Sequence, residues 1–133
     1  MDRKRTILFL LVSVLILFTQ ACSFTTAKIE NAVLTADPEA GEPRKAFSPN
    51  ETFYLVVALA NAPRDTVLKT TWIAVEIEGV EPDFVIDEVE ITTGLPIVTF
   101  DLANEYPWPP GSYQVDLYLN GELQESLDFR VLE

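Results

Sequence analysis

Two different hydrophobic patterns divide the chain. Residues 7–18 form an apolar run interrupted only by Ser13, whereas from Ile29 onward short apolar or alternating runs recur between turn-forming residues. No part of this second region keeps a helical period of apolar positions. Strict alternation places successive side chains on opposite faces of a strand. The sequence therefore predicts an all-β domain, preceded by a short apolar helix at the N-terminus.

The first part of the predicted domain contains two strands separated by a long loop. Residues 29–35 form the first β-like run, and the charged, turn-rich residues 37–44 follow it as a surface loop. Residues 52–60 are apolar on both faces. This pattern is typical of a strand in the middle of a sheet.

The register of residues 67–78 is open to two interpretations. Ile73, Val75 and Ile77 alternate with small or acidic residues, so we expect these three to face the core. Trp72 has the opposite parity. Either a bulge turns the tryptophan inward or it packs on the other face of the sheet.

The next two runs differ in regularity. In residues 84–92 the phase of the pattern changes between Ile86 and Val89, which predicts an edge strand or a bulge. Residues 97–102 alternate without a break. One face of that strand is expected to carry Val98, Phe100 and Leu102.

The strongest pattern is a C-terminal hairpin. Residues 111–119 alternate with apolar side chains at odd positions, and Asn120-Gly121 follows directly. Asn-Gly readily adopts the two positive φ values of a type I′ turn, which joins antiparallel strands. On the partner strand we expect the apolar residues Leu123, Leu127, Phe129 and Val131 to face the core, and Ser126, Asp128 and Arg130 to face water.

About seven strands in the 112 residues after position 21 suit an immunoglobulin-like β-sandwich. Pro110-Gly111-Ser112-Tyr113 resembles the tyrosine corner of such domains, and Trp72 resembles their core tryptophan. Val115 stands where their second cysteine would be, so the inter-sheet disulfide is absent. The resemblance implies an antiparallel sandwich over residues 29–133 and, by analogy of fold, an accessory or adhesion-like module.

The N-terminal run has the features of an export signal. Residues 1–5 carry three basic side chains, and the twelve residues 7–18 would cover about 18 Å as a helix, short of the ~30 Å of a hydrocarbon core. A secretory signal peptide over residues 1–21 is therefore favoured over a transmembrane span.

Residues 18–22, Phe-Thr-Gln-Ala-Cys, resemble the lipobox of bacterial lipoproteins. The resemblance implies a diacylglycerol on the thiol of Cys22, cleavage before it, and acylation, for example by palmitate, of the new amino terminus. Thr19 departs from the family's usual leucine, so a plain secretory signal with an accidental cysteine is the alternative. Residues 22–28 would then be the lipidated cysteine and a short tether, which holds the domain close to the outer side of the cell membrane or the outer membrane.

Charge and residue inventory limit the functions of the domain. After residue 21 the chain carries 6 basic and 20 acidic residues, a balance that opposes nucleic-acid binding. The chain has no histidine and one cysteine, and none of its five glycines form a nucleotide-binding loop, so most common hydrolase and nucleotide sites are excluded. We expect no cofactor, no metal and no enzymatic activity.

Two groups of residues remain as candidate binding positions. Residues 76–90 are rich in carboxylates, which would suit a calcium or ligand site, a carboxylate pair for catalysis, or a solvated acidic face. Trp108 and Tyr106 would form an aromatic platform or, as we favour, close the end of the core.

The leading hypothesis is a non-enzymatic, lipid-anchored lipoprotein that binds a protein or takes part in envelope assembly. The alternative is a calcium- or ligand-binding module that uses residues 76–90. The carboxylates of residues 76–90 belong to Glu76, Glu78, Glu81, Asp83, Asp87, Glu88 and Glu90.

Overall fold

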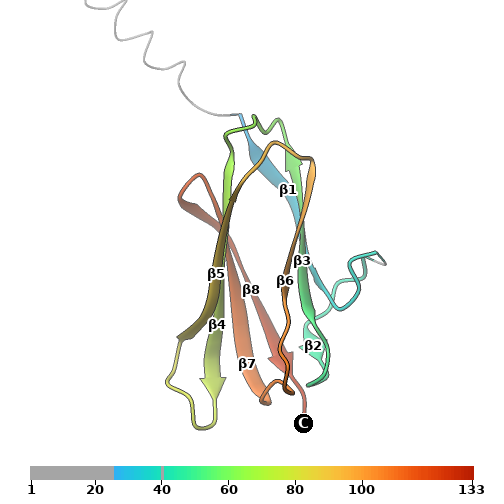
Figure 1. The fold of residues 1–133 in the computed structure, drawn as a ribbon, viewed down its shortest axis with the longest axis vertical. Helices are drawn as coiled ribbons and strands as arrows, with labels where there is room; N and C mark the ends of the chain where they lie inside the picture. The colour runs from blue at the N-terminus through green and yellow to red at the C-terminus, as the bar shows by residue number, and fades with distance from the viewer. Residues whose placement is uncertain (1–25, 40) are drawn as a thin grey trace, which may run out of the picture.

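The computed structural model describes residues 26–39 and 41–133, which form an all-β sandwich of two sheets (Figure 1). The predicted signal peptide, the lipobox and Cys22 lie outside the described residues. The strands are β1 (Lys28–Thr35), β2 (Ala46–Phe47), β3 (Phe53–Ala60), β4 (Val67–Ile77), β5 (Phe84–Thr92), β6 (Ile97–Leu102), β7 (Gly111–Leu119) and β8 (Glu122–Val131).

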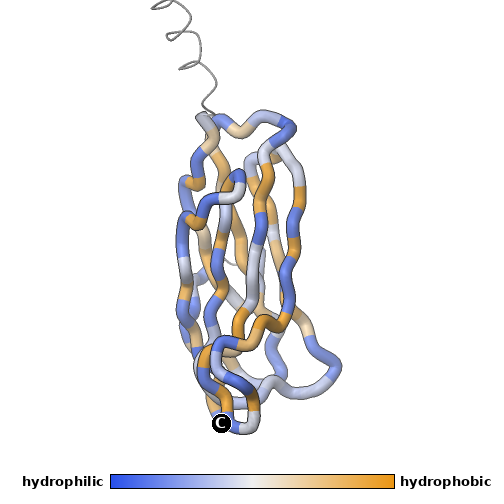
Figure 2. The backbone as a smooth tube through the Cα atoms, turned by 90° about the vertical axis from the view of Figure 1, so that its left-hand side faces the viewer, coloured by the Kyte–Doolittle hydropathy of each residue, from blue (hydrophilic) through white to orange (hydrophobic). Residues whose placement is uncertain are grey.

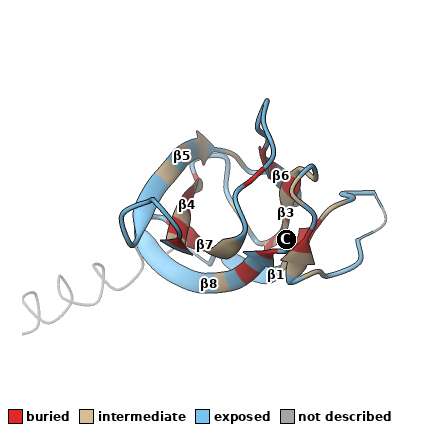
Figure 3. Cartoon of the chain, turned by 90° about the horizontal axis from the view of Figure 1, so that it is seen from below, coloured by how far each residue is buried: buried red, intermediate tan, exposed pale blue. Residues whose placement is uncertain are grey.

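One sheet has the order β1-β3-β6, and the other has the order β2-β8-β7-β4-β5. β2 pairs with β8 in parallel, and the other pairs in the described part of the chain are antiparallel. Seen from below, the two sheets face each other as two layers (Figure 3). The predicted sandwich is confirmed, as is the central place of β3, which lies between β1 and β6.

The additional strand is β2, where the chain crosses from one sheet to the other. It has two residues, too few to show an alternating pattern, so it could not be predicted from the sequence. Its neighbour Arg44 anchors the crossover: the two guanidinium nitrogens contact the two carboxylate oxygens of Glu51 at 2.6 and 3.1 Å, and one also donates to the carbonyl of Ala46. The amide of Ser48 donates to the same carboxylate. These hydrogen bonds hold the pKa of Glu51 below its usual range, with Arg44 as the largest cause.

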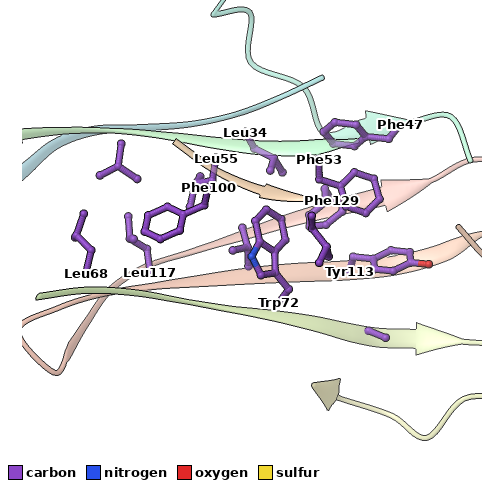
Figure 4. Close-up of a cluster of buried hydrophobic side chains, with 14 of the residues drawn as sticks. Leu34, Phe47, Phe53, Leu55, Leu68, Trp72, Phe100, Tyr113, Leu117 and Phe129 are labelled. Atoms are coloured by element: carbon purple, nitrogen blue, oxygen red, sulfur yellow. The ribbon is translucent and has the colours of Figure 1, made fainter. Parts of the chain in front are cut away.

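The core lies between the sheets. Hydrophobic and hydrophilic residues alternate along much of the sandwich (Figure 2). On β3 and β6 the alternation is strict, with every second side chain buried. Burial of this apolar surface is the main stabilising term of the fold. Figure 4 shows side chains of the two sheets meeting in this layer, among them Leu34, Phe53, Leu55, Phe100, Leu68, Trp72, Leu117 and Phe129.

The register of β4 corrects one expectation. Trp72 is fully buried and Ala74 is 3% exposed, whereas Ile73 and Val75 lie half-buried on the outer face. The pairing with β7 shifts between Ala74 and Glu76, and this bulge returns Ile77 to the core. The expectation that Ile73 and Val75 face the core was therefore wrong, while that for Ile77 holds.

The phase change in β5 has the expected cause. β5 is the last strand of its sheet, and its pairing with β4 passes from Trp72–Asp87 to Ile73–Val85, so Ile86 is the additional residue of a bulge. Ile86 and Val89, three positions apart, both pack against the core as a result. The sequence prediction of an edge strand or a bulge is confirmed on both counts.

The C-terminal hairpin has the predicted turn. Asn120 and Gly121 have φ values of 49° and 84°, and Leu119 pairs with Glu122 across the two-residue loop. Asn120 also ties the turn to β4, because its side-chain oxygen accepts from the amide of Val67 at 2.9 Å. Leu123 differs from expectation: a register shift next to Tyr118 leaves this leucine 53% exposed.

The predicted tyrosine corner is present at the start of β7. The hydroxyl of Tyr113 donates to the carbonyl of Pro109 at 2.6 Å. Trp108 is 7% exposed and stacks on Phe53 at a ring-centroid distance of 4.9 Å, so it closes the core as favoured. Tyr106, in contrast, is 74% exposed.

Candidate functional site

The acidic residues of segment 76–90 are spread along one edge of the sandwich. They occupy the end of β4, the β4–β5 turn and β5, and all seven are exposed. Within residues 26–39 and 41–133 no three histidine, cysteine or acidic side chains come close enough to hold a metal ion. The calcium alternative therefore gains no support from the geometry of these residues.

The outer face of the five-stranded sheet carries an apolar strip that the sequence analysis missed. Ile73 pairs with Val85, which is 50% exposed, and Val75 lies next along β4 on the same face. The parity of Trp72 was the available signal, because placing the tryptophan inside forces Ile73 and Val75 outside. A groove of about 390 Å³ adjoins this apolar strip, with Val75, Ser112 and Arg130 among its lining residues.

A row of hydrogen-bonded polar side chains crosses the same face above the apolar strip. Asp116 on β7 is 9% exposed and accepts hydrogen bonds of 2.6 Å from Ser126 on β8 and from Gln114. On the other side of β7, Thr71 of β4 donates to Glu88 of β5 at 3.3 Å. These contacts join β7 to β8 and β4 to β5, and they leave Asp116 with satisfied hydrogen bonds.

Lys69 is the one basic side chain of β4 and is held in place on this face. Its ammonium lies 4.3 Å from the ring centroid of Tyr118 and 3.9 Å from a carboxylate oxygen of Glu88. Since this carboxylate belongs to β5, Lys69 offsets part of the negative charge on that strand, through an exposed and therefore weak ion pair.

A second groove lies between the edges of the two sheets. It has a volume of about 450 Å³ and runs between β1 and β8, beside the loop that carries Arg44 and Lys45. Its walls carry both signs of charge, with Glu125 and Asp128 opposite the two basic residues. Charge of both signs gives this groove no evident preference for a cationic or an anionic ligand.

The described residues contain no helix that is long and apolar enough to cross a membrane. Cys22 lies outside the described residues, so its lipidation stays a prediction.

Strand order, the buried tryptophan of β4 and the tyrosine corner of β7 together define an immunoglobulin-like β-sandwich. The chain is similar in structure to an immunoglobulin-like protein from Pseudomonas aeruginosa, with a TM-score of 0.57 and 11% identity over 83% of this chain and 99% of the other. At this identity the likeness shows the fold alone.

Parts of two larger proteins have the same fold. An alkylpurine DNA glycosylase from Pseudomonas fluorescens, bound to DNA with an abasic site analog, matches at a TM-score of 0.51 and 20% identity over 80% of this chain. A β-glucosidase from Listeria innocua in complex with glucose matches at a TM-score of 0.51 and 14% identity, again over 80%. The chain spans 30% of the glycosylase and 16% of the glucosidase. No protein-family model and no curated protein matches the chain.

Proposed function

We propose that the chain is a lipid-anchored lipoprotein of the cell envelope, and that its immunoglobulin-like domain binds another protein and catalyses no reaction. The observation that carries the binding role is the outer face of the five-stranded sheet, where the exposed or half-buried Ile73, Val75 and Val85 lie side by side. Apolar residues that are gathered on one face, with charged residues around them, are typical of protein interaction sites.

The place of the first strand agrees with an anchor at Cys22. Lys28 pairs with Ala60, so β1 starts at the end of the sandwich that carries the β3–β4 connection (Figure 1). The six residues from Cys22 to Lys28 reach about 20 Å when extended. The β4–β5 turn lies at the opposite end of the sandwich, where it would face away from the membrane (Figure 1).

The anchor is tested by growing the producing cells with labelled palmitate. We expect label in the wild-type protein and none in Cys22→Ser, which should also leave the membrane fraction. Equal labelling of the two proteins, or none in either, would contradict the anchor.

The binding role needs a separate test that favours no face in advance. A photo-crosslinking residue is placed in turn at one exposed or half-buried position on each strand of the full chain, in cells that produce it. A discrete adduct with one other protein at neighbouring positions is expected. If none of the positions gives an adduct, the proposed binding role is wrong.

A further inference from the structure

The free edge of β5 is the place in the sandwich best suited to receive another strand. β5 pairs with β4 on one side, and in the described part of the chain no strand pairs with its other side. An edge strand presents unpaired backbone N–H and C=O groups, which an extended segment of another chain can pair with. With nine residues, β5 is long enough to receive such a segment.

Several side chains at this edge are apolar and accessible. An edge strand that only prevents pairing with other chains usually carries charged residues or proline instead. Phe84 and Val85 are 52% and 50% exposed. On the inward side of the strand, Val89 and Ile91 pack against the core yet keep part of their surface accessible. A strand added beside β5 would cover these side chains and extend the core by one strand.

The negative charge at this edge favours a basic strand as the binding partner. Residues 70–129 contain no lysine and no arginine, and on β5 the outward residues Glu88 and Glu90 pair with Thr71 and Lys69 of β4. A second copy of this chain that paired through β5 would bring these carboxylates next to their equivalents, which is unfavourable. A basic strand would instead gain from each of them.

We propose that β5 binds an extended, basic segment of a partner protein by strand addition, with lysine or arginine side chains beside Glu88 and Glu90 and apolar side chains over Val89 and Ile91. This inference rests on the proposed binding function and names its surface and the chemistry of its partner.

The test uses the full chain in micelles of an uncharged detergent and a labelled nine-residue peptide of alternating valine and lysine. We expect saturable binding by fluorescence anisotropy, with slower amide hydrogen exchange confined to β5. Two control peptides separate the causes: one carries glutamate in place of lysine, and one is N-methylated at alternate backbone nitrogens. The first should not bind because of its charge, and the second because it cannot pair as a strand.

A matched pair of double variants locates the site. Glu88→Gln with Glu90→Gln should weaken binding of the lysine peptide about tenfold, as expected for the loss of two exposed charge pairs. Glu122→Gln with Glu125→Gln changes the net charge equally on the exposed β8 and should leave the affinity within about twofold.

Three results would overturn the proposal: no binding of the lysine peptide, equal binding of the N-methylated peptide, or equal weakening by both double variants. None of them bears on the proposed binding function, because the crosslinking scan reads every face of the sandwich. An adduct at positions away from β5 would retain that function and place the partner elsewhere.

Discussion

Tyr113 on β7 is joined to Pro109, four residues earlier, by a hydrogen bond of 2.6 Å from its hydroxyl to the proline carbonyl. The ring is 1% exposed and stacks on Phe129 of the neighbouring strand at 5.4 Å. One side chain thus fixes the course of the segment that enters β7 and fills the core between the sheets.

Loss of this hydroxyl should weaken the fold without emptying the core. Tyr113→Phe keeps the ring and removes the hydrogen bond, so we expect the free energy of unfolding to fall by about 1 to 2 kcal/mol. Urea denaturation of the full chain in detergent measures it. Tyr118→Phe, on the outer face, is the control and should cost less than about 0.5 kcal/mol. Equal losses in the two variants would contradict a special role for the corner.

The buried hydroxyl of Tyr113 should also make the fold less stable at alkaline pH. Burial raises the pKa of Tyr113 to about 12 from its ordinary value near 10, because the phenolate is poorly solvated in the core. Between about pH 10 and 12 the unfolded chain releases this proton and the folded chain retains it, so stability falls as pH rises through that window. Tyr113→Phe should lose less stability over the same range. The denaturation midpoint, measured against pH for both proteins, checks this.

Thr70 and Thr71 should respond differently to the same substitution. The hydroxyl of Thr70 is buried without a hydrogen-bond partner among the described residues, whereas that of Thr71 donates to Glu88. Thr70→Val should therefore raise the free energy of unfolding by about 1 kcal/mol, and Thr71→Val should leave it unchanged or lower it. Thermal denaturation of both variants compares them. A stabilised Thr71→Val with an unchanged Thr70→Val would refute this assignment.

Gly111 and Gly121 both have positive φ but differ in their surroundings. A Cβ on Gly121 would meet nothing within 4 Å, so Gly121→Ala should cost only the backbone strain, about 1 kcal/mol. A Cβ on Gly111 would lie 2.6 Å from the carbonyl oxygen of Glu76. Gly111→Ala should therefore cost about 3 kcal/mol or more, since β4 must move away from β7. Chemical denaturation ranks the two variants, and a smaller loss for Gly111→Ala would contradict the close approach.

Features encoded by neighbouring residues were predictable from the sequence. Asn120-Gly121 specifies its own turn, and Pro110 to Tyr113 carry a local motif, so both emerged from the chain directly. The register of β4 was not predictable in this way. Its inward positions include small or polar residues such as Thr70 and Ala74, and a bulge then changes the parity before Ile77.

The proposed binding edge of β5 was likewise predictable only in part from the sequence. The absence of lysine and arginine from residues 70–129 is visible in the sequence, but not the placement of Glu88 and Glu90 along a free edge. Strand order depends on pairings between distant parts of the chain, and a strand's own pattern does not specify its neighbour. The placement of Val85 beside Ile73 and Val75 could not be predicted for that reason.

Both tryptophans stack on the ring of one phenylalanine. Phe53 stacks on Trp108 at 4.9 Å and on Trp72 at 6.5 Å, whereas Leu68 and Leu117 fill the layer farther along the strands (Figure 4). Intrinsic fluorescence will therefore report on the aromatic half of the sandwich. Local unfolding that starts around Leu68 and Leu117 would not change the tryptophan fluorescence until it reached Phe53.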